Sequence, residues 1–181
     1  VCLTWWSRPA VLGFNDTRMF QSGAKRVLRD RGQPLKAILT KVRQRSVQTT
    51  IDTTVAFEGT GLHLGRPVSV VVRLAPADHG VVFRRTGVDA HEADVPALWH
   101  RVIVSPLNTR IENAAGTSVS TIEHIMAALA GCGLNNALIE VTGPEVPILD
   151  GSAAQVVEGF LHAGIRRLDA PLRVIEVRKS V

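Results

Sequence analysis

The sequence is short of cysteine and of long apolar runs, and each shortage excludes a class of protein. Its 181 residues include two cysteines, Cys2 and Cys132. Two thiols so far apart form neither a disulfide framework nor a cysteine-based zinc motif, which favours a reducing, cytoplasmic location. No apolar stretch approaches the roughly 18 to 20 residues that cross a bilayer, so we expect a soluble protein without a transmembrane segment.

Positive charge is concentrated at one end of the chain. The net charge is +5, but residues 1–46 alone carry +8 and residues 47–181 carry −3. Affinity for a phosphate backbone depends on clustered cations, so the body of the protein is not expected to bind nucleic acid. Residues 1–46 lack a sustained helix or strand period and are interpreted as a basic, disordered or weakly helical extension. A nucleic-acid-binding or membrane-surface arm is the alternative.

Alternating apolar and polar residues predict a series of short strands after residue 46. The first is expected at 47–58, where Val47, Ile51, Val55 and Phe57 occupy odd positions among polar residues. Strands 67–74 and 81–85 flank the turn PADHG and are predicted to form a hairpin. Further strands are predicted at 101–105, 108–112 and 136–143, with a turn at 113–116, and the final LRVIEVRKSV begins another.

Two helices separated by a strand complete the pattern. The second opens on a capping-box pattern of Ser152 and Gln155 and ends at Gly164. Its predicted apolar stripe consists of Val156, Val157, Phe160 and Leu161. Several strands followed by helix, strand, helix and strand predict an α+β fold, a single domain over 47–181 with both helices on one face of a mixed sheet.

The first helix carries an adjacent glutamate and histidine near its start. With Ser120 as N-cap, Glu123 completes an S-x-x-E capping box and suits the helix dipole, which is a purely structural explanation. At about 100° per residue, however, His124 lies opposite the apolar stripe and is flanked by alanines. That stripe consists of Ile122, Ile125, Met126 and Leu129, and the flanking alanines are Ala127 and Ala128. An imidazole beside a carboxylate on such a face fits a metal ligand with a neighbouring general base.

One histidine does not make a zinc site. Catalytic zinc takes three protein ligands and water, and the sequence contains neither HExxH nor HxxEH. The other histidines lie in predicted loops, turns or helix ends, where surface positions are the more common outcome: His63, His79, His91, His100 and His162. The residues alone therefore support half a site.

Four stretches in series carry a family resemblance: GTGLHLG (59–65), APADHGVVFRR (75–85), STIEHIMAALAGCGLNN (120–136) and PEVPILDGSA (144–153). In this order they resemble the N-terminal half of UDP-3-O-acyl-N-acetylglucosamine deacetylases, the zinc amidases of lipid A biosynthesis in Gram-negative bacteria. The resemblance covers about residues 43–181. It implies two similar α+β domains packed helix layer to helix layer, with the active site between them.

The resemblance also implies roles for individual residues. His124 matches a zinc ligand, and Glu123 matches the general base that activates the attacking water. His63 and the preceding Leu62 match a Leu-His-x-Gly loop near the substrate. The resemblance further implies the reaction: hydrolysis of the N-acetyl group of the UDP-sugar substrate with release of acetate, the committed step of lipid A synthesis.

The remaining zinc ligands and the general acid of the family belong to its second domain, which these 181 residues do not include. We therefore expect the chain alone to hold zinc poorly and to be inactive. Two alternatives stay open: a basic nucleic-acid-binding α+β module, and a non-catalytic interaction domain of the same fold.

Other charged residues are interpreted structurally. In PEVPILDGSA, Glu145 and Asp150 belong to a proline-stiffened turn, and Asp150 is expected to satisfy amides at the next helix start. Arg84 and Arg85 are interpreted as a solvated strand end, with a diphosphate clamp as the alternative.

Overall fold

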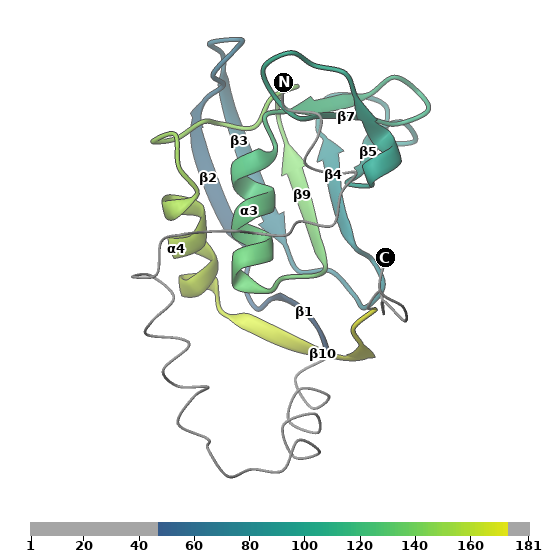
Figure 1. Ribbon diagram of the computed structural model, residues 1–181, viewed down its shortest axis with the longest axis vertical. Helices are drawn as coiled ribbons and strands as arrows, with labels where there is room; N and C mark the ends of the chain where they lie inside the picture. Colours follow the sequence, from purple (N-terminus) through teal and green to yellow (C-terminus); the bar gives the residue numbers. More distant parts are fainter. Residues whose placement is uncertain (1–46, 174–181) are drawn as a thin grey trace, which may run out of the picture. The chain divides into compact units, whose positions relative to one another are not determined.

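A five-stranded mixed sheet lies at the centre of the computed structural model, which describes residues 47–173 (Figure 1). Its strands, in spatial order, are β2 (Val55–Thr60), β3 (Pro67–Arg73), β9 (Ala137–Val141), β4 (Val81–Arg85) and β5 (Asp94–Pro96). Only the β4–β9 pair is parallel. Helices α3 (Glu123–Cys132) and α4 (Ala154–Ala163) pack side by side on one face of this sheet (Figure 1). The predicted α+β fold is confirmed.

Two smaller sheets and one 3-10 helix accompany the central sheet. In one, β1 (Val47–Ile51) pairs antiparallel with β10 (Ile165–Pro171); the other contains β6 (Val102–Ile103), β7 (Arg110–Glu112) and β8 (Ser118–Ser120). The 3-10 helix spans Trp99–Arg101. Strands β5, β8 and β10 were not predicted. The predicted extension 1–46 and residues 174–181 of the predicted last strand lie outside the described residues.

Alternation along the strands builds the core. The inward residues of β3 and β9 form one buried cluster with apolar residues of both helices: Val68, Val70, Val72, Ala137, Ile139, Val141, Ile125, Leu129, Val156 and Phe160. The Phe57 and Phe160 rings meet edge to face with centroids 6.2 Å apart, which joins β2 to α4. Within residues 47–173, no helix combines the length and apolarity that a membrane crossing requires.

The predicted hairpin of 67–74 and 81–85 is wrong. Strand β9 lies between β3 and β4, antiparallel to the first and parallel to the second. The hairpin partner of β3 is instead β2, joined through the loop that carries His63. Alternation indicates which side chains face the core, but it does not specify which strand becomes the neighbour.

The predicted single strand at 47–58 is also wrong, because the chain leaves one sheet after Ile51 and enters another at Val55. In β1 Gln48 and Thr50 are buried while Val47 is only half-buried, which is the reverse of the expected alternation; Ile51 is buried, as expected. Hydrogen bonds explain their burial. Gln48 Oε1 accepts from the Asp78 amide at 2.8 Å and from Asn136 Nδ2 at 2.9 Å, and Thr50 Oγ1 accepts from the Ala75 amide at 2.9 Å.

The outward faces of the helices differ from the prediction at two positions. Ala128 is fully buried, so the small-residue face of α3 consists of Ala127, Ala130 and Gly131 instead. In α4, Leu161 is 62% exposed and lies outside the apolar stripe. Gly164 follows the last residue of α4, as predicted.

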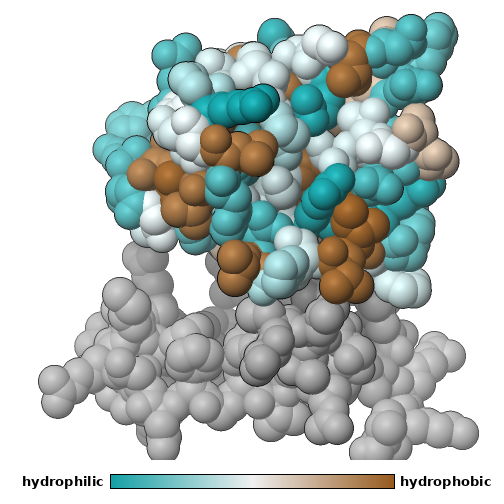
Figure 2. Space-filling view, turned by 90° about the horizontal axis from the view of Figure 1, so that it is seen from above, coloured by the Kyte–Doolittle hydropathy of each residue, from teal (hydrophilic) through white to brown (hydrophobic). Residues whose placement is uncertain are grey.

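Exposed apolar side chains gather in segment 98–107, at Leu98, Trp99, Val102, Val104 and Leu107. On the face drawn in Figure 2, hydrophobic residues form separate groups among hydrophilic ones. Separate apolar groups among polar residues, as on this face, are normal on protein surfaces.

Candidate active site

The start of α3 differs from the predicted capping box. Ser120 belongs to β8, and its hydroxyl donates to the Pro144 carbonyl at 3.0 Å instead of capping the helix. Thr121 then adopts a left-handed backbone with φ +59°, and Glu123 is the first helical residue. The Glu123 carboxylate accepts a hydrogen bond from the Thr109 amide, which precedes β7. Glu123 is therefore oriented by a neighbouring loop, and the capping-box prediction is wrong.

His124 is half-buried and lines a shallow pocket between the helices and the sheet. The pocket is otherwise mainly apolar, and its lining comes from β2, β3, α3, α4 and the turn before α4: Phe57, Val70, Ile125, Val146, Pro147, Ile148, Leu149, Ser152 and Val156. An imidazole at the edge of an apolar pocket has access to solvent or to a ligand. A core position for His124 is excluded by its exposure.

His63 and Leu62 lie in the exposed loop between β2 and β3, where Leu62 is 58% exposed. The loop closes on itself because the Gly65 amide donates to the Gly61 carbonyl at 3.1 Å. It is tied to the rest of the site through its backbone. The His63 amide donates to Glu145 Oε1 at 2.9 Å and the Leu64 amide to Oε2 at 3.0 Å.

Glu145 is the residue that joins these parts, and its side chain is only 2% exposed. Besides the two loop amides, it accepts a hydrogen bond from Thr121 Oγ1 at 2.9 Å. Burial alone would raise the pKa of Glu145, but the hydrogen bonds from His63, Leu64 and Thr121 outweigh burial and lower it. The prediction that Glu145 is structural did not include this link between the His63 loop and α3. In the sequence, the only hint of this link is the pair of glycines in GLHLG, Gly61 and Gly65, which indicates a loop whose backbone can be approached closely.

Comparison with known proteins identifies the family. The model described as LpxC, UDP-3-O-acyl N-acetylglycosamine deacetylase, matches residues 48–181. The chain belongs to this family. It is 44% identical over 140 residues to a UDP-3-O-acyl-N-acetylglucosamine deacetylase of Vibrio cholerae serotype O1, covering 77% of this chain and 44% of the relative.

Two further deacetylases of the same name agree. Identity is 45% over 134 residues with that of Phenylobacterium zucineum, covering 74% of this chain and 46% of the relative. Identity with the enzyme of Myxococcus xanthus is 42% over 134 residues, which cover 74% of this chain and 42% of the relative. The chain thus spans less than half the length of these curated relatives.

The described part of this deacetylase-family chain contains at most a fraction of a metal site. Within residues 47–173, no group of three or more His, Cys, Asp or Glu side chains lies close enough together to hold a metal ion. His124 provides one accessible imidazole, which suits zinc, while the pocket around it supplies apolar walls and the Ser152 side chain. Among the described residues, His124 could fill one ligand position of a metal site.

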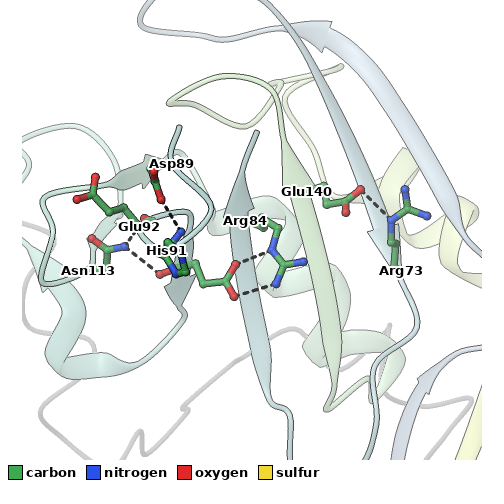
Figure 3. Close-up of polar contacts among 8 residues, drawn as sticks. Arg73, Arg84, Asp89, His91, Glu92, Asn113 and Glu140 are labelled. Atoms are coloured by element: carbon green, nitrogen blue, oxygen red, sulfur yellow. Dashed lines mark hydrogen bonds and ion pairs between the residues drawn. The ribbon is translucent and has the colours of Figure 1, made fainter. Parts of the chain in front are cut away.

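The two arginines of β4 are engaged by neighbouring groups, as Figure 3 shows for Arg84. The Arg84 guanidinium pairs with both oxygens of Asp94, Nε to Oδ1 at 2.6 Å and Nη2 to Oδ2 at 2.9 Å, and this pairing lowers the pKa of Asp94. Arg85 Nη1 donates to the Ser118 carbonyl at 3.0 Å. Both residues therefore act in holding strands together, which favours the structural interpretation over a diphosphate clamp.

Proposed function

We propose that the chain provides the Glu123–His124 half of the active site of a zinc-dependent deacetylase acting on UDP-3-O-acyl-N-acetylglucosamine in lipid A biosynthesis. The observation that carries the proposal is the family match over residues 48–181, which includes this pair. The accessible position of both side chains at the start of α3 supports it. The name shared by the relatives supplies the substrate class.

In this proposal His124 would hold zinc through an imidazole nitrogen, and Glu123 acts as the general base. Bound zinc would polarise the acetamide carbonyl and lower the pKa of water. The Glu123 carboxylate takes a proton from the attacking water, whose oxygen forms a bond to the carbonyl carbon. The carbon–nitrogen bond then breaks, acetate leaves, and the glucosamine nitrogen gains a proton to become a free amine. The Thr109 amide holds the Glu123 carboxylate in place for this transfer.

The loop with Leu62 and His63 is proposed to contact the substrate. Both side chains are exposed, while the loop backbone is fixed to Glu145. An exposed pair on an anchored loop suits recognition, because the residues contact the ligand without reorganising the loop.

A second domain is proposed to supply the remaining zinc ligands and the general acid. The fraction of the relatives' length that this chain covers, 44% for the Vibrio cholerae enzyme, is consistent with one of two domains. The exposed small residues Ala127, Ala130 and Gly131 on α3 give another helix layer room to approach closely. We expect the 181-residue chain with added zinc to release no acetate, and robust turnover by that chain would contradict the two-domain proposal.

The role of the pair is tested in a complete two-domain enzyme. Glu123→Gln and His124→Gln should each lower kcat by at least about 100-fold, because a positioned general base contributes about 10²- to 10⁴-fold and a lost ligand weakens the metal site. His91→Gln, at an exposed loop position, is the control and should retain activity. Deacetylation that survives both substitutions would remove Glu123 and His124 from the mechanism.

A further inference from the structure

Glu145 is a buried carboxylate whose three hydrogen-bond donors come from two separate parts of the chain. The amides of His63 and Leu64 belong to the β2–β3 loop, and the Thr121 hydroxyl lies two residues before Glu123. A buried carboxylate is costly unless donors satisfy it. Here each donor also belongs to a segment that carries a proposed site residue.

The backbone around Glu145 lies between the same two segments. Ser120 pairs with Glu145 in a parallel bridge, and the Val146 amide donates to the Ser120 carbonyl at 3.0 Å. On the other side Gly61 pairs with Pro147. Residues 144–148 thus form a strap, and the Glu145 side chain of this strap contacts both neighbouring segments.

The strap and the His63 loop pack so closely at Gly61 that a side chain there would clash with Glu145. A Cβ atom on Gly61 would lie 2.5 Å from Glu145 Oε2 and 2.9 Å from its Cδ. Close approach of the Gly61 backbone is therefore what lets both loop amides reach the carboxylate. The position of the loop follows from the position of the Glu145 side chain.

The contact with Thr121 extends to Glu123. Thr121 is a β-branched residue with φ +59°, a conformation that persists only where its surroundings enforce it. Its hydroxyl donates to Glu145 and accepts from Asn108 Nδ2 at 3.3 Å. Asn108 precedes Thr109, whose amide donates to the Glu123 carboxylate. A continuous set of hydrogen bonds and one peptide link therefore runs from Glu145 to Glu123.

We infer that Glu145 is a positioning residue for the deacetylase site, which fixes the His63 loop and the Glu123–His124 helix start in one relative arrangement. The inference rests on the proposed function, because it assumes that these two segments act on one substrate. Glu145 itself contacts neither substrate nor metal in this account. Its role is to hold the base and the substrate loop in register.

The geometric part is tested on the 181-residue chain by amide hydrogen exchange. Glu145→Gln places an amide NH₂ group against donors, so exchange at the His63 and Leu64 amides should accelerate about 10- to 100-fold, the equivalent of losing a hydrogen bond to a charged acceptor. Glu58→Gln, an exposed substitution on β2, is the control and should leave both amides unchanged. Unchanged exchange in Glu145→Gln would overturn the inference.

The functional part uses a complete two-domain enzyme. Glu145→Gln should lower kcat about 10- to 100-fold and also raise KM, because both the base and the substrate loop lose their fixed positions, at temperatures where the variant is fully folded. Thr121→Val should act in the same direction, and Thr121→Ser, which keeps the hydroxyl, should restore most of the activity. This pair keeps the test available if Glu145→Gln fails to fold.

The outcomes separate the two proposals. If His124→Gln is inactive while Glu145→Gln and Thr121→Val keep kcat within about twofold of the wild type, the positioning role is refuted and the proposed function stands. If the unfolded fraction of each variant accounts for its whole loss of kcat, Glu145 contributes only to stability and the inference fails. If Glu123→Gln and His124→Gln both remain active, the proposed function fails, whatever the amide exchange reports.

Discussion

Replacing Gly61 by alanine should destabilise the chain although the new methyl group is small. Gly61 has no left-handed backbone angle, so alanine can adopt its conformation and the cost comes from contact alone. The added Cβ would lie 2.5 Å from Glu145 Oε2, a separation that the Glu145 side chain must move to relieve. Any such movement lengthens the bonds from the His63 and Leu64 amides.

The size of the effect follows from these bonds. Hydrogen bonds to charged groups contribute about 1.5–3 kcal/mol each, and displacement of the carboxylate weakens at least one. Alanine also restricts the unfolded chain, which offsets about 0.4–1 kcal/mol. The expected net loss is about 0.5–2.5 kcal/mol in the free energy of unfolding. Urea unfolding of the 181-residue chain, followed by circular dichroism, measures it.

Two comparisons make the prediction sharp. Gly131→Ala makes the same change in helix α3, where the new Cβ meets nothing within 4 Å, so it should stabilise by about 0.5–1 kcal/mol. In a Glu145→Ala background the clashing atoms are gone, so Gly61→Ala should cost little there. Equal stability of Gly61→Ala and the wild type, or an undiminished cost in the Glu145→Ala background, would refute the reasoning.

Three other outcomes are expected. Phe160→Ala empties a fully buried position beside Phe57 and should lower the free energy of unfolding by about 3–5 kcal/mol, whereas Leu161→Ala, 62% exposed, should change it little. Because hydrogen bonds lower the pKa of Glu145 below its ordinary value of 4.5, its contribution to stability is complete above that pH and is lost as the pH falls through the lowered pKa. Urea midpoints measured from pH 7 to pH 3 should therefore fall less in Glu145→Gln than in the wild type, and identical pH profiles would contradict the assignment. Residues 47–181, which carry a net charge of −3, should show no tight RNA binding at moderate salt, and tight binding in a gel-shift titration would favour the nucleic-acid-binding alternative.

Much of the layer structure could be predicted because local pattern and final burial agree there. In β3 and β9 every second residue is buried, as in Val68, Val70 and Val72, and the two helices lie where their apolar spacing places them. The insertion of β9 between β3 and β4 could not be predicted from alternation, which is independent of the neighbouring strand. The burial of Gln48 and Thr50 was missed for a related reason, since their partners are far away in the sequence.

The sequence singles out the candidate site residues but not the geometry around them. The Glu123–His124 pair was found from its helix position and its family resemblance. The capping box was wrong because Thr121 takes a left-handed conformation, which its β-branched side chain disfavours locally and which contacts with Glu145 and Asn108 hold in place. Only the folded arrangement reveals that Glu145 contacts both the His63 loop and the start of α3.

The most direct measurement for the central claim is zinc content together with acetate release in Glu123→Gln and His124→Gln versions of a complete two-domain enzyme. The account predicts that Glu123→Gln keeps its zinc and loses turnover, because only the base is removed, and that His124→Gln loses both. Full zinc and full turnover in His124→Gln would contradict the assignment of this histidine as a ligand.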